Sequence, residues 1–187
     1  MLKYFEEFGE YVEITGFRNV RIEDAEGFLK ATRREQQDNA VQFFNAELVA
    51  TWQHLYFAVL NALTAFRNKT NVSKSVAVEV MLYASAQRQI RKAIALVGVK
   101  RDSATVAAVI IGESSDAVKA ALSSVSKRIN AELDDAVLAL SNAKMHSIRR
   151  AFSISEREVE TVMKAGNVEQ TLVDLIIERV ALLSTKL

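Results

Sequence analysis

Residues 105–111 read TVAAVII, and this stretch decides the fold. From Val106 on, its side chains are apolar at every position, not at every second one, and many are β-branched. This pattern is typical of a central strand that is buried on both faces. Gly112 follows the run and is expected to end the strand. The chain should therefore contain a small sheet flanked by helices.

Two further stretches are expected to be strands of the same sheet. Residues 10–18 (EYVEITGFR) mix β-branched and aromatic residues with polar ones. Residues 40–44 (AVQFF) form a short apolar run, which indicates another buried strand. We therefore expect a mixed or antiparallel sheet of three to four strands, whose order the sequence does not define.

The rest of the chain is predicted to be helical. The strongest periodicity lies in residues 46–67, after a capping Asn45, where apolar side chains recur at steps of three and four. Residues 73–97 also read as helical and stop at Gly98. Further helices are predicted at 22–34, 116–129, 134–150, 155–164 and 168–183, with Ser155 and Glu158 forming a capping box at the start of the fourth.

The composition supports a helix-rich α+β protein. The chain has 187 residues, no proline and only six glycines, which favours long helices and few tight turns. Its predicted order, β-α-β-α-α-β followed by helices, fits neither a doubly wound fold nor a repeat array. We therefore expect a single α+β domain over residues 1–187, with a helical C-terminal portion from about residue 134 onwards.

Residue types that are absent or scattered exclude several kinds of chemistry. Without cysteine there is no disulfide, thiolate zinc site or cysteine nucleophile. The GxGxxG, GxxxxGK[ST] and GxSxG patterns do not occur. His54 and His146 lack metal-ligand spacing, so we expect no metal, no cofactor and no enzymatic activity. We interpret His54 as a hydrogen-bonded residue at the edge of an apolar stripe, and a hydrolase built around it is the alternative.

The sequence also bears on location. No run of about 18 uncharged apolar residues occurs, and the N-terminal stretch MLKYFEEFGEYVE is acidic, without the pattern of a cleaved signal. We therefore expect a soluble, cytoplasmic protein without a membrane partner.

Charge is unevenly distributed along the chain. The formal net charge is +1, which is too small for general binding of polyanions. Residues 67–101, however, contain eight lysines and arginines against the single acid Glu79, a net charge of +7, and the remaining chain carries −6. Such a window indicates a local anion-binding surface or a solvated helix face.

The most basic part of this window predicts a binding surface for single-stranded nucleic acid. If residues 73–97 form one continuous helix, then Lys74, Arg88 and Lys92 share a face with Met81 and Ser85. That face can hold phosphates, the small residues 84–86 allow close approach, and Gln87 and Gln89 can read base edges. The opposite face is expected to be core and contains Val76, Val80, Tyr83, Ile90, Ala93, Ile94 and Val97. An ordinary amphipathic surface helix is the alternative.

Glu79 is out of place on such a helix, because it falls on the buried side. An unpartnered buried carboxylate is costly. Either backbone groups and a nearby arginine bind it, or the helix is interrupted at residues 84–86. We favour the interruption.

Two stretches carry a resemblance to a known family. Residues 42–63 (QFFNAELVATWQHLYFAVLNAL) and 73–94 (SKSVAVEVMLYASAQRQIRKAI), with HLYFA, LYAS and QRQI as their most specific parts, resemble the TPRKB family. Its members are small non-enzymatic subunits of the KEOPS complex. The family commonly has a glycine where this chain has Ala86.

The resemblance implies a role in making threonylcarbamoyladenosine in tRNA, with catalysis by a separate transferase subunit. Such subunits hold the single-stranded 3′ CCA end of tRNA and dock on the small atypical kinase or ATPase of the complex. It would place Lys74, Arg88 and Lys92 at phosphates and Ser85, Gln87 and Gln89 near bases. A protein-only adaptor that stimulates the kinase without touching RNA is the alternative. The apolar residues 172–183 are either core or the kinase-facing surface.

Overall fold

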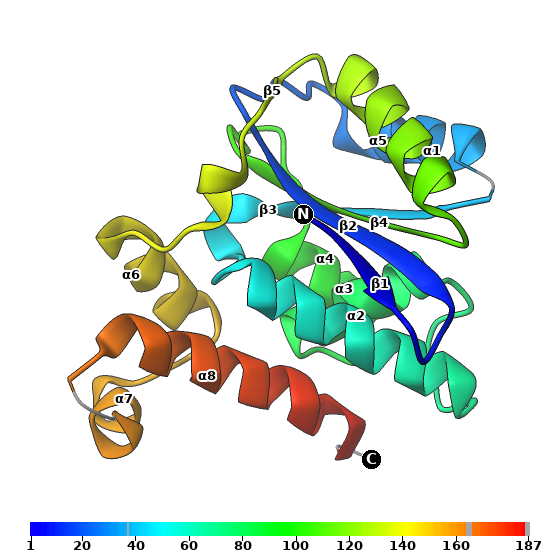
Figure 1. Cartoon of the computed structure of the whole chain (residues 1–187). Coiled ribbons are helices and arrows are strands. Elements are labelled where there is room, and N and C mark those ends of the chain that lie inside the picture. The colour runs from blue at the N-terminus through cyan, green and yellow to red at the C-terminus, as the bar shows by residue number, and fades with distance from the viewer. Residues whose placement is uncertain (37, 164–165, 186–187) are drawn as a thin grey trace.

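The computed structural model describes residues 1–36, 38–163 and 166–185 and shows a helix-rich α+β fold around an antiparallel sheet (Figure 1). The strand order is β1-β2-β4-β3, and a fifth short strand, β5, pairs with the end of β2. The strands are β1 (Leu2–Phe5), β2 (Glu10–Arg18), β3 (Ala40–Asn45), β4 (Val106–Gly112) and β5 (Glu132–Leu133). Of the predicted mixed or antiparallel sheet of three to four strands, the described part of the chain shows the antiparallel form with five strands, and β1 and β5 were not foreseen.

Strand β4 lies inside the sheet, between β2 and β3, and all seven of its residues are buried. Alternate side chains enter different cores, as the pleat requires. Ala107, Val109 and Ile111 belong to the core beneath α2, whereas Val106 and Ile110 belong to the core beneath α5. The sequence prediction of a central strand buried on both faces is confirmed.

One face of the sheet is covered by α1 (Ala25–Glu35) and α5 (Ser115–Ile129), as Figure 1 shows. Asp24 caps α1 by accepting a hydrogen bond from the Gly27 amide at 3.0 Å. The Ser114 hydroxyl caps α5 in the same way, and Asn130 ends it in a left-handed conformation with φ 46°. Polar cap residues therefore set where α1 begins and where α5 begins and ends.

The other face is covered by α2 (Trp52–Arg67), α3 (Val76–Ser85) and α4 (Ile90–Val97). The helix predicted to start at residue 46 begins as a 3₁₀ turn, η1 (Ala46–Leu48), because the Asn45 side chain caps the Glu47 amide and closes one short turn. Val49 and Thr51 are then extended, so α2 starts only at Trp52. Asn45 does cap a helical segment, as predicted.

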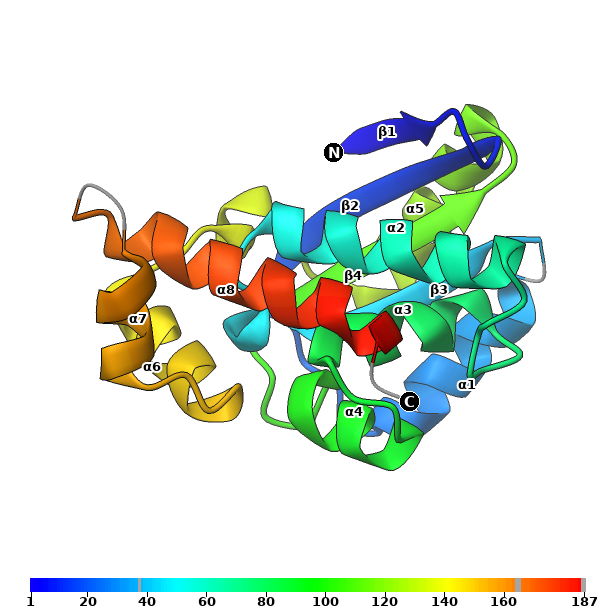
Figure 2. The same cartoon turned by 90° about the horizontal axis from the view of Figure 1, so that it is seen from below.

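The C-terminal part is helical and packs beside α2, as Figure 2 shows for α8. It consists of η2 (Asp135–Leu138), α6 (Asn142–Ala151), α7 (Glu156–Val162), α8 (Val168–Leu182) and η3 (Leu183–Thr185). The single helix predicted over residues 134–150 is wrong, because Asp134 caps η2 and Ser141 separately caps α6. Lys164, the predicted end of the helix from residue 155, lies outside the described residues.

The predicted capping box is half present. The Ser155 hydroxyl accepts a hydrogen bond from the Glu158 amide at 3.1 Å. The Glu158 carboxylate instead binds Arg179 of α8, with 2.9 Å between Oε1 and Nη1, and this pairing lowers the pKa of Glu158. An ion pair between α7 and α8 therefore replaces the expected side-chain contact to the cap.

The C-terminal helices are attached to the sheet at Gly16 of β2. The Asp134 amide donates to Gly16 O at 2.8 Å, and the Gly16 amide donates to the Asp135 carboxylate at 3.1 Å. A Cβ at Gly16 would clash with Val137 and would lie 2.7 Å from Asp134 O. Lys144 of α6 is buried, and its ammonium donates to Val137 O at 2.8 Å and to Ala139 O at 3.2 Å. Residues 134–139 are thus held by Gly16 of β2 on one side and by Lys144 of α6 on the other.

Candidate nucleic-acid interface

The helix predicted over residues 73–97 is interrupted at Ala86. Helix α3 ends at Ser85, and Ala86 is left-handed with φ 51° and ψ 34°. The Ala86 amide donates to Tyr83 O at 2.9 Å, and the Gln87 amide donates to Leu82 O at 3.0 Å. These bonds are typical of a helix C-cap, where glycine is usual because it has no Cβ. The favoured interruption is confirmed, and the single cationic helix face is wrong.

The six predicted site residues lie at four locations on the two sides of the break. Gln87, Arg88 and Gln89 form the turn after α3, and Lys92 lies in the first turn of α4; Gln87 is half-buried, and Arg88, Gln89 and Lys92 are exposed. Exposed Lys74 lies just before the opposite end of α3, about 15 Å away for a ten-residue helix.

Ser85, the sixth predicted site residue, is fully buried. Its hydroxyl donates to Leu82 O at 3.0 Å, so the backbone of its own helix uses it. Met81, which the continuous helix placed on the cationic face, is also buried. The surface is consequently narrower than the helical projection predicted.

The start of α4 has the features of an anion-binding helix terminus. Its first turn contains Arg91 and Lys92 and no acid, and the N-cap residue Gln89 makes no side-chain capping bond within the described chain. The first amides of a helix lack intrahelical acceptors, and the helix dipole favours negative charge there. Arg91 was missed because a continuous helix put it outside the basic face.

Two isoleucines beside these basic residues are exposed, contrary to the sequence prediction. Ile90 is 42% exposed and Ile94 is 50% exposed. The continuous helix placed both in the core. The turn after Ala86 gives α4 a new orientation, in which Ala93 and Val97 are the buried residues. The α4 surface therefore combines aliphatic side chains with positive charge.

Glu79 organises the turn that presents Lys74. The carboxylate is buried and accepts hydrogen bonds from the Ser73 amide at 2.7 Å and the Val72 amide at 3.1 Å. The two explanations considered for this acid both hold in part, since backbone amides bind it and the helix is interrupted. Tyr83 beside it belongs to the core, as expected, and burial raises its pKa.

His54 fixes the end of α3. Its ring is fully buried; Nδ1 accepts from the Ala50 amide at 3.2 Å, and Nε2 donates to Ala84 O at 2.8 Å. Burial lowers the pKa of His54 to about 4. The imidazole is therefore neutral near pH 7, and both nitrogens bind backbone, one of them the Ala84 carbonyl two residues before the break at Ala86. His54 is hydrogen-bonded as predicted, although it is buried more deeply than a boundary position, and His146 is exposed.

Part of the basic window is already paired within the protein. Arg67 binds Glu7 at 3.3 Å and stacks over the Phe8 ring at 4.8 Å from its centroid. Lys100 and Arg101 are exposed but follow α4. Net charge from the sequence thus overestimates the charge that one surface presents.

Two other kinds of feature are absent from the described residues. They contain no group of three or more acidic or histidine side chains arranged to hold a metal ion. No helix in the described ranges has both the length and the apolar character needed to span a bilayer.

Replacing Ala86 with glycine should stabilise the protein. We expect the free energy of unfolding to rise by about 1 kcal/mol, since the left-handed conformation strains an alanine and not a glycine. Thermal denaturation should show a melting temperature higher by about 2–4 °C. The same substitution at Ala84, inside α3, is the matched control and should lower stability. An unchanged or lower melting temperature for Ala86→Gly would contradict the assigned strain.

The fold is that of a small, helix-rich α+β protein with a basic and partly apolar surface at the start of α4. Comparison with known proteins gives the family. The sequence matches the family described as Kinase binding protein CGI-121 over residues 17–184. It is also 31% identical over 145 residues to the "Regulatory protein Cgi121" of Methanocaldococcus jannaschii, covering 78% of this chain and 83% of that protein. The chain therefore belongs to the CGI-121 family, which confirms the resemblance found in the sequence.

Proposed function

We propose that this protein is a non-catalytic accessory subunit of the KEOPS complex, which makes threonylcarbamoyladenosine in tRNA. In this role it docks on the small kinase or ATPase subunit and contacts the transferase subunit only indirectly. It holds the single-stranded 3′ CCA end of tRNA in the cytoplasm. Membership of a family described as kinase binding supports the docking role.

The observation that carries the RNA part is the basic first turn of α4. Arg91 and Lys92 lie where the helix dipole already favours anions, next to the Gln87–Gln89 turn. Guanidinium and ammonium groups bind phosphates, and side-chain amides can read unstacked bases. Ile90 and Ile94 add exposed apolar surface for base faces. Lys74 can contact the RNA strand only from the far end of α3.

Charge reversal at this turn tests the RNA role. We expect the double variant Arg91→Glu/Lys92→Glu to weaken tRNA binding at least about tenfold. The slope of log affinity against log salt concentration should also fall, by the amount that about two phosphate contacts contribute. Filter binding at several salt concentrations measures both quantities. Lys119→Glu/Lys127→Glu on α5 is the control, since it makes the same charge change at exposed positions in the layer across the sheet.

Removing the CCA end from the tRNA should have an effect of similar size on the wild-type protein, and little further effect on the double variant. If both changes leave tRNA affinity intact, this surface does not bind RNA. The protein-only adaptor then becomes the better account, since the family description names only kinase binding. Stimulation of the kinase by the Arg91→Glu/Lys92→Glu variant would show that role directly.

A further inference from the structure

We infer that the kinase docks on an acidic groove that runs along α8, from the start of α2 to the end of α7, and that it does so with a basic segment carrying an apolar anchor. This inference rests on the kinase-docking part of the proposed function. The apolar residues 172–183 are mostly core, because Leu172, Ile176, Val180 and Leu183 are buried; Val173 and Leu175 are also largely buried but line the groove.

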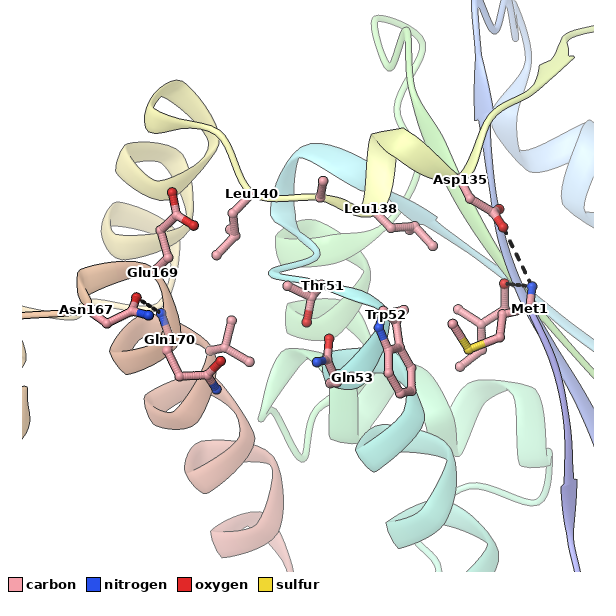
Figure 3. A pocket seen from close by; sticks show the side chains of 13 residues that line it. Met1, Thr51, Trp52, Gln53, Asp135, Leu138, Leu140, Asn167, Glu169 and Gln170 are labelled. Carbon is pink, nitrogen blue, oxygen red and sulfur yellow. Dashed lines mark hydrogen bonds and ion pairs between the residues drawn. The ribbon is translucent and has the colours of Figure 1, made fainter. Parts of the chain in front are cut away.

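The groove begins as a hollow of about 440 Å³ where the first turns of α2 and α8 meet residues 138–140 (Figure 3). Its apolar lining comes from Trp52, Leu138, Leu140 and Val173. This volume and lining suit one large side chain of a partner, in the way that a pocket receives an anchor residue.

A second hollow of about 410 Å³ continues from the first along α8. The two share Asn167 and Gln170, and the second reaches Val162 at the end of α7. Val162 is 45% exposed, and Val168, in the first turn of α8, is 40% exposed. The two hollows together can hold an extended or helical segment that is longer than one anchor residue.

Charge identifies the kind of segment that fits. The exposed acids Asp135 and Glu169 line the first hollow, and Asp174 and Glu178 line the second. No lysine or arginine is among the described residues that line either hollow, but the Met1 ammonium lines the first one and lies 3.7 Å from the Asp135 carboxylate. The negative charge of the groove therefore comes from Glu169, Asp174 and Glu178. A basic protein segment is therefore complementary to the groove, whereas the phosphates of an RNA are repelled.

The wall of the first hollow also offers hydrogen bonds. The Thr51 hydroxyl is buried and has no partner among the described residues, and Thr51 caps α2 without a side-chain bond in that part of the chain. Figure 3 shows Thr51 and Gln53 between Trp52 and the start of α8. An incoming backbone amide or carbonyl can pair with this hydroxyl, which would otherwise stay unsatisfied.

Two variants test the groove, with the purified KEOPS kinase of the same organism as the probe. Asp174→Lys/Glu178→Lys reverses two exposed charges, and Ala139→Trp fills the first hollow from an exposed position. We expect each variant to raise the dissociation constant for the kinase at least about tenfold in calorimetry. Affinity for tRNA should stay the same, and circular dichroism should show a folded protein.

The matched control is Glu23→Lys/Asp116→Lys, which makes the same charge change in the layer across the sheet and should leave kinase binding unchanged. If the wild-type protein binds the kinase and neither groove variant weakens this binding, the inference is overturned and the proposed function stands. Failure of the wild-type protein to bind the kinase would remove the docking function itself, and the inference with it. Loss of affinity in the control as well would show a non-specific charge effect and would also overturn the groove assignment.

Discussion

Replacing His54 with alanine should lower the free energy of unfolding by about 3 kcal/mol or more. The substitution removes a fully buried ring that stands edge-on to Phe152 and leaves a cavity in the core. It also leaves the Ala50 amide and Ala84 carbonyl, both buried, without their partner. Each such group costs about 1–3 kcal/mol when it is unsatisfied. Urea denaturation at pH 7.5 measures the loss, and His146→Ala, at an exposed histidine, should be neutral.

The same residue predicts acid sensitivity. In the unfolded chain His54 takes a proton near pH 6.5, whereas in the folded protein its pKa is lowered to about 4. Between these values the unfolded state binds more protons, so stability falls as pH falls, by about 1.4 kcal/mol per pH unit from this group. The stability of His54→Ala should depend less steeply on pH across this window. Parallel pH profiles for the two proteins would contradict the assignment of a buried neutral imidazole.

Replacing Gly16 with alanine should be the second strongly destabilising change, with a loss of about 2–3 kcal/mol. The added methyl group would meet Val137 and would lie only 2.7 Å from the Asp134 carbonyl oxygen. Backbone oxygen cannot turn away as a side chain can, so residues 134–139 must shift from β2. Limited proteolysis should then cut this segment faster, alongside a lower urea midpoint.

A second substitution separates the two clashes at Gly16. Val137→Ala removes the side-chain contact but leaves the Asp134 carbonyl in place. The double variant Gly16→Ala/Val137→Ala should therefore recover only part of the lost stability. Full recovery would show that the carbonyl contact does not matter, and wild-type stability of Gly16→Ala alone would contradict the close packing of η2 on β2.

The central part of the fold was predictable because burial on both faces leaves a clear mark. Strand β4 is apolar at every position, and β2 and β3 matched their predicted ranges almost residue for residue. Strand β1 was missed because it lies at the sheet edge with a mostly exposed sequence, LKYF, and β5 is only two residues long. Such strands are defined by pairing with β2, which periodicity along the chain does not report.

The site was harder to predict than the fold. Apolar spacing is the same on both sides of Ala86, so nothing in the periodicity of residues 73–97 marks the reversal between α3 and α4. Buried Glu79 was the one sign of it, and it indicated the interruption correctly. Once α4 is turned, Ile90 and Ile94 become exposed and Ser85 is enclosed. A helical projection of residues 73–97 could not predict which of these side chains are exposed and which are buried.

The length of α3 constrains how this protein can change over evolutionary time. Its ten residues fix both the spacing and the relative direction of Lys74 and the first turn of α4. One inserted residue would rotate everything beyond it by about 100° and advance it by about 1.5 Å. His54 would then no longer face the Ala84 carbonyl. Orthologues should therefore vary residues 76–85 by substitution and keep their number constant, while insertions collect in surface turns.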